Sequence, residues 1–252
     1  MVRASARHAG GQRFKSSTVH MNFEVLYENE DFLAIDKPAG IIVFPEGKIK
    51  EKTIIDFLLE KFPELKKVGS APRYGIVHRL DKDTSGILLV AKNNKVLEFL
   101  QKEFKTGRIY KKYLALAIGK VKNKVGKIET LIGRSPKDRK KQKVFLFNEP
   151  GAKERRKAET HYKVLKKYKK YTLIEVEPKT GRKHQIRVHL AHLGYPVAGD
   201  KLYDFKNQPV PKGLKRQFLH ASFLKIKVSV DKEIKIKSEL PENLKKILEN
   251  LK

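Results

Sequence analysis

The sequence predicts an α+β fold, and two observations support this prediction. Segments with the composition of β-strands outnumber segments with helical spacing. Two dense polar clusters, at residues 78–86 and 182–187, are each embedded in apolar sequence and resemble two halves of one site. Because 252 residues suffice for one well-filled core, we expect one main domain.

The first half of the chain alternates short strands with helices. Both predicted helices have apolar side chains at helical spacing, such as Ile54, Leu58 and Phe62 in the first. The first polar cluster lies on a loop between two buried strands, where a rigid scaffold displays functional groups. We expect strands at 23–27, 32–35, 75–77 and 87–90, and helices at 53–62, capped by Thr53, and at 93–104.

The second half is richer in strands. A closing amphipathic helix begins near Pro241 and has leucine and isoleucine on one side. We expect strands at 110–118, 127–132, 161–165 and 171–176, and helices at 185–193 and 241–251.

Residues 134–157 are rich in lysine and arginine and lack apolar periodicity, which indicates a basic loop or hairpin. It is either a solvated surface loop or an arm that closes over a phosphate backbone, where basic side chains position the partner without reading its sequence.

The first twenty residues differ from the rest, with four basic residues, no acidic one and no apolar period. A transit peptide, a disordered RNA-binding arm and an extension before a start at Met21 all fit this composition. We favour a disordered or non-native extension at residues 1–20, with the folded domain at 21–252.

The charge of the chain points to a polyanionic partner. Lysine and arginine total 57 against 28 acidic residues, which gives a net charge of +29. A thermophilic or merely solvated surface usually carries balancing acids, so nucleic acid is the favoured partner and an anionic membrane a distant second.

The sequence contains no cysteine, which excludes disulfides, thiolate catalysis and cysteine-based zinc sites. No run of about 18 apolar residues occurs, so we expect a soluble protein without a membrane span.

Asp81 is the candidate reacting group. A carboxylate can act as a nucleophile when a neighbouring cation keeps it ionised, and arginine suits this role because its planar fork binds carboxylates and remains charged. Arg187, the last basic residue of the second cluster, is the candidate partner. The alternative is that Asp81 and Asp83 merely cap a turn.

Other kinds of site have weaker support. His184, His189 and His192 could offer metal ligands, but no cysteine or nearby acid supplements them. The segment from Asp81 to Thr84 partly matches a two-aspartate phosphatase motif but lacks its apolar strand, and no phosphate-binding P-loop is present.

The first cluster resembles the signature of the RluA-type pseudouridine synthases, which isomerise uridine in ribosomal and transfer RNA. The likeness extends in the same order over roughly residues 22–228. It rests on Asp36-Lys37-Pro38-Ala39-Gly40, His78-Arg79-Leu80-Asp81-Lys82-Asp83-Thr84-Ser85-Gly86, Lys111 with Tyr113-Leu114-Ala115, Thr180-Gly181-Arg182-Lys183-His184-Gln185-Ile186-Arg187, Gly199-Asp200 and Leu219-His220-Ala221.

The resemblance implies a bent, mixed, mostly antiparallel sheet with peripheral helices and a central cleft. It implies that Asp81 attacks the ribose or promotes uracil departure, that Arg187 pairs with it, and that Tyr113 stacks on the uracil and assists the final proton removal. Arg79 would lie beside the flipped nucleotide. The remaining RNA-binding candidates are His78, Arg182, His184 and Gln185.

The resemblance also implies that no metal or cofactor is needed. Many members of this family carry an additional S4-type RNA-binding domain, which we do not expect here, so the catalytic domain itself would select the target. We expect RNA as partner, no obligate protein partner, a monomer, and a cytoplasmic location, or an organellar one if residues 1–20 are a transit peptide. The alternative function is a non-catalytic RNA-binding protein of the same fold.

Overall fold

The computed structural model describes residues 23–47, 51–228 and 233–251, so the predicted extension at 1–20 lies outside the described residues. The strands are β1 (Glu24–Glu28), β2 (Phe32–Lys37), β3 (Ser85–Ala91), β4 (Tyr110–Ile118), β5 (Val125–Arg134), β6 (Gln142–Phe145), β7 (Arg156–Lys167), β8 (Tyr171–Pro178), β9 (Leu219–Lys227) and β10 (Glu233–Lys237). The helices are α1 (Ile54–Lys61), α2 (Asn94–Lys105), α3 (Gln185–His192) and α4 (Glu242–Glu249), with short 3₁₀ turns at Pro63–Lys67 and Ala152–Glu154.

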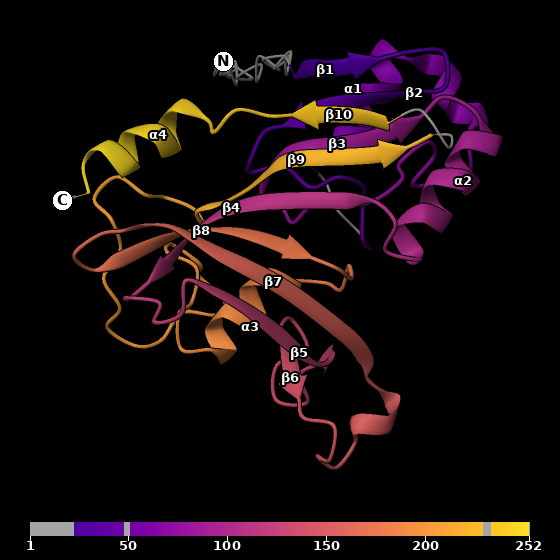
Figure 1. Ribbon diagram of the computed structural model, residues 1–252. Helices are drawn as coiled ribbons and strands as arrows, with labels where there is room; N and C mark the ends of the chain where they lie inside the picture. Colours follow the sequence, from indigo (N-terminus) through magenta and orange to yellow (C-terminus); the bar gives the residue numbers. More distant parts are fainter. Residues whose placement is uncertain (1–22, 48–50, 229–232, 252) are drawn as a thin grey trace, which may run out of the picture.

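The strands form one sheet in the order β1-β2-β3-β9-β4-β8-β7-β5-β6, and β10 pairs with β9. Strands β3 and β9 are parallel, whereas the other pairs of named strands are antiparallel. The sheet changes direction between β4 and β8, so that an upper and a lower half meet at an angle (Figure 1). This arrangement confirms the predicted bent, mixed, mostly antiparallel α+β fold.

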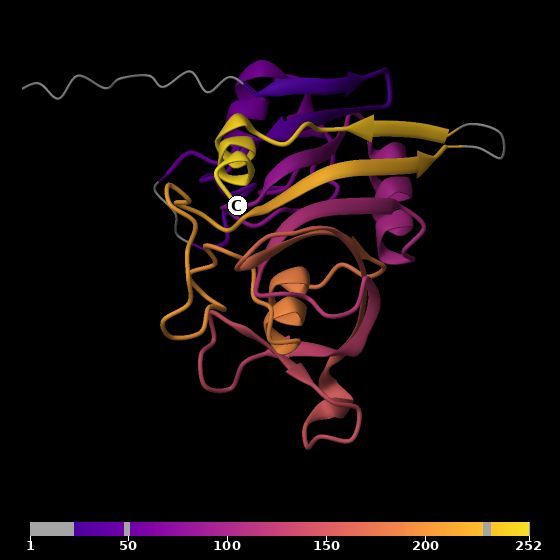
Figure 2. The same ribbon diagram turned by 60° about the vertical axis from the view of Figure 1, so that its left-hand side comes forward.

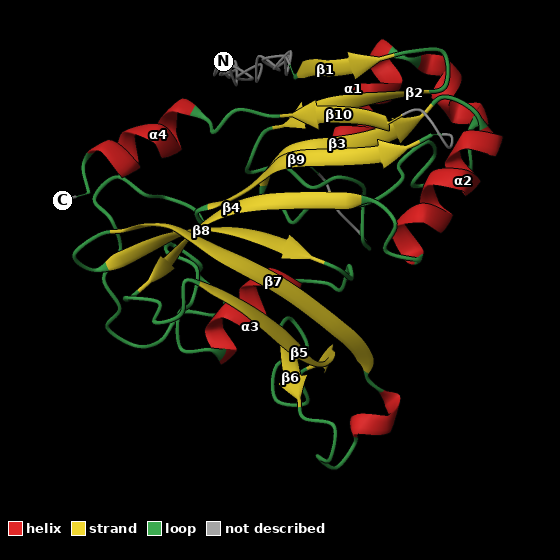
Figure 3. Cartoon of the chain, viewed as in Figure 1, coloured by secondary structure: helices red, strands yellow, loops and turns green. Residues whose placement is uncertain are grey.

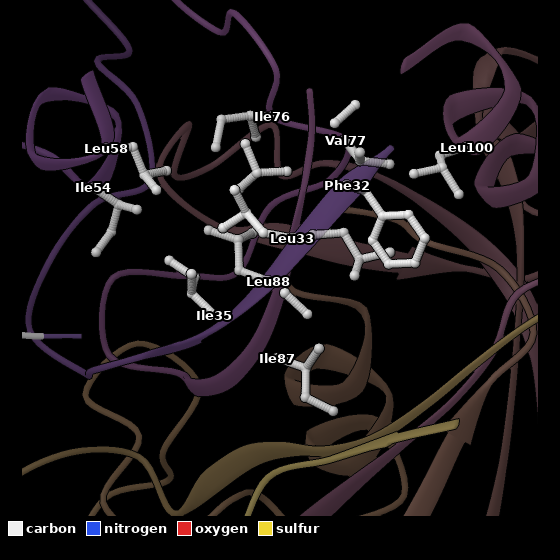
Figure 4. Packing of buried hydrophobic residues seen from close by; sticks show 14 of the residues in the cluster. Phe32, Leu33, Ile35, Ile54, Leu58, Ile76, Val77, Ile87, Leu88 and Leu100 are labelled. Atoms are coloured by element: carbon white, nitrogen blue, oxygen red, sulfur yellow. The ribbon is translucent and has the colours of Figure 1, made fainter. Parts of the chain in front are cut away.

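The upper half contains the larger hydrophobic core. Strand β2 and strand β3 are almost fully buried, and α1 and α2 add their apolar faces to the same cluster. Figure 4 shows Leu33 and Leu88 close to Ile54, Leu58 and Ile76. The predicted helices are confirmed, and their starts follow local hydrogen bonding.

The two helix starts use different caps. The carboxylate of Asp56 accepts hydrogen bonds of 2.7 and 2.8 Å from the backbone N–H and hydroxyl of Thr53. Asn93 Oδ1 accepts the backbone N–H of Val96 at 2.9 Å.

The lower half is covered by α3, while the other helices lie at the periphery of the upper half or at the junction (Figures 2 and 3). Ile186 and Leu190 of α3 pack against Ala115, Ile174 and Val176 of β4 and β8. The amino end of α3 thereby lies next to the place where the two halves of the sheet meet.

The strands differ from the expectation at 75–77 and include elements that were not predicted. Residues 75–77 form no strand; Ile76 makes only an isolated bridge to Val90. The basic segment 134–157, expected as a loop or hairpin, contains β6 as the partner of β5, which confirms the hairpin. Strands β9 and β10 were not predicted, although β9 lies at the centre of the sheet.

Candidate active site

A cleft with a volume of about 430 Å³ lies where the two halves of the sheet meet. Side chains from both polar clusters line it, although the clusters are about a hundred residues apart in the sequence. All eight candidate site residues line this cleft: His78, Arg79, Asp81, Tyr113, Arg182, His184, Gln185 and Arg187.

Lys37 fixes the loop that carries Asp81. Its side chain is fully buried, and its Nζ donates hydrogen bonds to the carbonyls of Pro38, Lys82 and Thr84 at 2.7, 3.1 and 2.9 Å. Burial lowers the pKa of Lys37 to about 7, although a neutral amine would leave one of the three carbonyls without its donor. The loop is therefore held from inside by one ammonium group.

Asp81 faces Arg187 across the cleft. Arg187 Nη1 donates a 2.8 Å hydrogen bond to Asp81 Oδ2. The Nε and Nη2 groups of the same guanidinium donate to the two carboxylate oxygens of Asp200 at 2.7 and 2.9 Å. Because a hydrogen-bonded guanidinium favours an ionised carboxylate, this pair suits a nucleophilic or electrostatic role for Asp81.

Arg187 carries its positive charge although its side chain is buried. Burial alone would lower its pKa, but the hydrogen bonds and charges of Asp200 and Asp81 more than offset burial, so the pKa of Arg187 is raised. The side chain of Asp81 is bonded to Arg187 and retains 18% exposure toward the cleft, so its carboxylate does not serve as a turn cap.

Tyr113 and Lys111 enter the cleft from β4, the strand at the bend of the sheet. Burial, together with the negative charge of Asp81, raises the pKa of Tyr113 well above its usual value, so the phenol is protonated at neutral pH. Burial also lowers the pKa of Lys111 to about 8, which the charge of Glu177 opposes. The cleft thus offers one neutral phenol and one readily titrated amine.

Arg79 lies at the lip of the cleft. It forms an ion pair with Glu46, and its guanidinium lies 5.6 Å from the ring centre of Phe44. Glu46 also approaches Lys183, at 3.5 Å. The side chain of Arg79 is about one-third exposed, so it can reach a bound polyanion by exchanging a surface carboxylate for a phosphate.

His78 and Gln185 are occupied within the protein. His78 Nε2 accepts a hydrogen bond from the backbone N–H of Leu89 at 3.1 Å. The His78 ring stacks on Phe104, and burial lowers the pKa of this imidazole to about 3. The buried Gln185 amide makes four hydrogen bonds, to Thr180, Thr160 and the backbone of Arg182 and Glu159.

These bonds show how both side chains are held within the protein. No donor or acceptor of the Gln185 amide is left over. The bonded nitrogen of His78 faces its own backbone. Both residues therefore help to hold the loops that display Arg79, Asp81 and Arg182.

Arg182 and His184 remain at the cleft surface. Arg182 Nε donates to the carbonyl of Lys157 at 2.9 Å, and burial, with the charge of Arg156, lowers its pKa. His184 has a left-handed backbone, with φ of 56°, at the start of α3. Its Nε2 lies 3.8 Å from Asp81 Oδ1.

The three histidines considered as metal ligands do not meet. His189 is fully buried, and its two ring nitrogens lie 2.9 Å from the hydroxyls of Thr130 and Thr160. Within the described ranges, no group of three or more metal-ligating side chains is present. None of the helices in these ranges is long and apolar enough to cross a bilayer.

Sequence reasoning did not assign a role to Asp200, Tyr203 or Lys37. Asp200 is a buried carboxylate on a segment without regular structure, and its only signal was the Gly199-Asp200 pair within the family likeness. Tyr203 follows three residues later, and its hydroxyl lies 2.8 Å from His184 Nδ1. Lys37 appeared only as part of the first motif.

The site thus combines a carboxylate–arginine pair with a cleft lined by lysine and arginine, in a chain with a net charge of +29. Residues 31–192 match the family described as RNA pseudouridylate synthase. The chain therefore belongs to the RNA pseudouridylate synthase family, and the predicted membership is confirmed.

Proteins of similar sequence support the same family assignment. An uncharacterized RNA pseudouridine synthase of Aquifex aeolicus is 43% identical over 75% of this chain and 58% of its own length. The ribosomal large subunit pseudouridine synthase D of Xanthomonas campestris is 37% identical over 90% of this chain and 69% of its own length. The chain spans only 58% and 56% of the length of two similar relatives, from Aquifex aeolicus and Chloroflexus aurantiacus.

The fold also agrees with a solved structure. Human RNA pseudouridylate synthase domain containing 1 superposes with a TM-score of 0.71 at 27% identity, covering 88% of this chain and 85% of the human chain.

Proposed function

We propose that this chain isomerises specific uridines in RNA to pseudouridine, with Asp81 as the reacting carboxylate. The observation that carries the proposal is the 2.8 Å hydrogen bond from Arg187 to Asp81 at the floor of a cleft rimmed by cations. A protein that only binds RNA has no need for a half-buried carboxylate facing an anionic partner.

The two oxygens of the Asp81 carboxylate have different roles in this proposal. Arg187 binds Oδ2, which leaves Oδ1 for the nucleotide. That oxygen either attacks ribose C1′ or promotes departure of the uracil. The bond between C1′ and nitrogen breaks, the uracil turns, and a bond from C1′ to carbon replaces it. If Asp81 is bound to C1′, formation of this new bond releases the carboxylate. The carbon then loses its proton and the freed nitrogen takes one up, so atoms and charge balance.

Tyr113 and Arg79 handle the extruded base in this proposal. An enzyme acting on a base removes it from its stack at a cost of a few kcal/mol, which stacking on an aromatic ring can offset. Tyr113 lines the cleft from β4 next to the charge of Asp81. Because its phenol is protonated, it would assist the final proton removal as a relay, taking up one proton while releasing its own. Arg79 at the lip would lie beside the nucleotide or fill its vacated place.

The basic hairpin around β6 would supply much of the sequence-independent affinity. It carries lysine and arginine along residues 134–157, and Leu146 and Phe147, which follow β6, are exposed, at 57% and 51%. Cations that track a phosphate backbone and exposed apolar side chains that contact bases are the usual components of a single-strand RNA surface.

We further propose ribosomal RNA as the first substrate class to test, with transfer RNA as the alternative. Several relatives over most of this chain are named ribosomal large subunit pseudouridine synthase D. The proposal includes a cytoplasmic monomer that needs no metal or cofactor, since an ionised carboxylate, a phenol and RNA binding suffice for the isomerisation.

The test is to incubate the protein and its Asp81→Ala variant with unmodified ribosomal and transfer RNA, and to map pseudouridine by carbodiimide labelling and reverse transcription. Stops produced only by the intact protein would establish the activity and identify the target. No stops with either RNA, despite tight and salt-sensitive binding, would contradict the proposal and favour a non-catalytic RNA-binding protein.

A further inference from the structure

Tyr203 contacts Arg187 of the catalytic pair with its ring and His184 with its hydroxyl. Its ring lies under the guanidinium of Arg187, 5.1 Å from ring centre to the guanidinium carbon. Its hydroxyl lies 2.8 Å from His184 Nδ1 and accepts the backbone N–H of Gln142 at 2.7 Å. The tyrosine is buried, so its hydroxyl proton needs an acceptor inside the protein.

The hydrogen-bond pattern selects one form of His184. Because the Tyr203 oxygen already accepts the N–H of Gln142, its own O–H is the group left to donate, and Nδ1 of His184 is in reach. A neutral imidazole that accepts at Nδ1 carries its proton on Nε2. Burial lowers the pKa of His184 to about 4, so the neutral ring prevails at physiological pH.

The Nε2 side of His184 faces the oxygen of Asp81 that Arg187 leaves free. Nε2 lies 3.8 Å from Oδ1, whereas Arg187 binds Oδ2. This separation is longer than a hydrogen bond, but such contacts often shorten when substrate closes the site. The opposite tautomer would present a lone pair to the carboxylate and repel it.

The backbone conformation of His184 also supports an orienting role of its ring toward Asp81. His184 adopts φ of 56°, which is uncommon for a residue other than glycine, and such conformations persist where the surrounding structure holds them. The edge of its ring packs against Tyr203, with 5.6 Å between ring centres. The strained position thus brings one ring between the Tyr203 hydroxyl and Asp81.

We propose that Tyr203 is a positioning residue, which holds His184 in the tautomer with hydrogen on Nε2 so that this N–H orients Oδ1 of Asp81 for reaction. This inference rests on the proposed function for its catalytic part. The Tyr203 hydroxyl is also bound by the backbone of Gln142 in β6, the strand within the basic hairpin. The position of that hairpin therefore affects the Asp81 carboxylate through the side chains of Tyr203 and His184.

The catalytic test is a double-mutant cycle of Tyr203→Phe and His184→Gln, read as single-turnover rate and RNA dissociation constant. Tyr203→Phe should slow the reaction about tenfold and change the dissociation constant less than about twofold. Glutamine supplies an N–H at the distance of Nε2 and has no tautomer to fix. Tyr203→Phe should therefore cost much less in the His184→Gln background.

Tyr195→Phe is the matched control, since Tyr195 packs in the neighbouring cluster and does not line the cleft. It should keep the wild-type rate. A wild-type rate in Tyr203→Phe, or an equal loss in both backgrounds, would overturn the proposed role, as would a loss explained by weaker binding alone.

The tautomer is tested without activity, by nitrogen-15 NMR of the imidazole, with the His184 signal assigned by its absence in His184→Gln. Wild type should show hydrogen on Nε2, and Tyr203→Phe a mixture of both tautomers. The same tautomer in both proteins would overturn the inference. If wild type makes no pseudouridine but shows this tautomer shift, the proposed function fails while the positioning of His184 by Tyr203 stands.

Discussion

Asp200 binds Arg187 through two hydrogen bonds of 2.7 and 2.9 Å and leaves Nη1 of the same guanidinium for Asp81. Oδ1 of Asp200 also accepts the backbone N–H groups of Leu202 and Tyr203, at 2.9 and 3.2 Å. Asp200 is thus both the anchor of the arginine and the organiser of the segment that carries Tyr203.

Replacing Asp200 with asparagine should damage both stability and rate. The new amide would place N–H donors against the donors of Arg187, so the guanidinium would lose its fixed position. We expect a loss of about 3 kcal/mol in the free energy of unfolding and a rate about a hundredfold lower, measured by urea unfolding and single-turnover assays. Asp204→Asn, at an exposed position nearby, should change neither; an unaffected rate in Asp200→Asn would contradict the anchoring role.

Tyr113→Phe should separate stacking from proton transfer. The phenylalanine ring keeps the stacking surface but lacks the hydroxyl, so RNA affinity should stay within about twofold while the rate falls at least about a hundredfold. Tyr113→Ala should lose about 1–3 kcal/mol of binding as well. A fully active Tyr113→Phe would restrict this residue to stacking.

RNA affinity should fall as the pH rises through the titration of Lys111. The pKa of Lys111 is lowered by burial to about 8, so its charge is present below that pH and lost above it. Binding measured with the Asp81→Ala protein should weaken about threefold between pH of about 6.5 and about 8.5. Lys111→Met should bind more weakly at low pH and show a flatter profile. An equally steep profile in that variant would assign the pH dependence to other groups.

Lys37→Met should destabilise the protein through the loop of Asp81. The variant leaves the carbonyls of Pro38, Lys82 and Thr84 without their buried donor, and we expect about 3 kcal/mol lower free energy of unfolding. Lys92→Met, which removes a more exposed lysine, is the comparison and should cost about 1 kcal/mol or less. Equal losses in the two variants would contradict a special role for the buried ammonium group.

The sequence predicted the elements whose apolar spacing is strong. Helix α2 and strand β4 were predicted to within a residue, because their buried positions follow one period and polar residues bound them. Strand β10 and the end of β9 alternate lysine with isoleucine, a pattern that also suits a solvated surface. The place of β9 between β3 and β4 depends on contacts far apart in the sequence.

The candidate site was predictable where chemistry is local and less so where it depends on packing. The pairing of Asp81 with Arg187 followed from the residue types and the family likeness, and the structure places the two side chains in contact. The sequence could not show that the Gln185 amide is fully bonded, because two of its partners, Glu159 and Thr160, lie about 25 residues earlier in the chain. Asp200 and Tyr203 lie on irregular backbone with no periodic signal.

The most direct test of the account compares single-turnover pseudouridine formation by wild type, Asp81→Asn and Asp83→Asn, with RNA binding measured in parallel. Asp83 is the matched control because it lies in the same loop and does not line the cleft. The account predicts no detectable product from Asp81→Asn, a rate within about threefold of wild type from Asp83→Asn, and similar RNA affinity in all three proteins. Substantial product from Asp81→Asn would contradict the assignment of Asp81 as the reacting carboxylate.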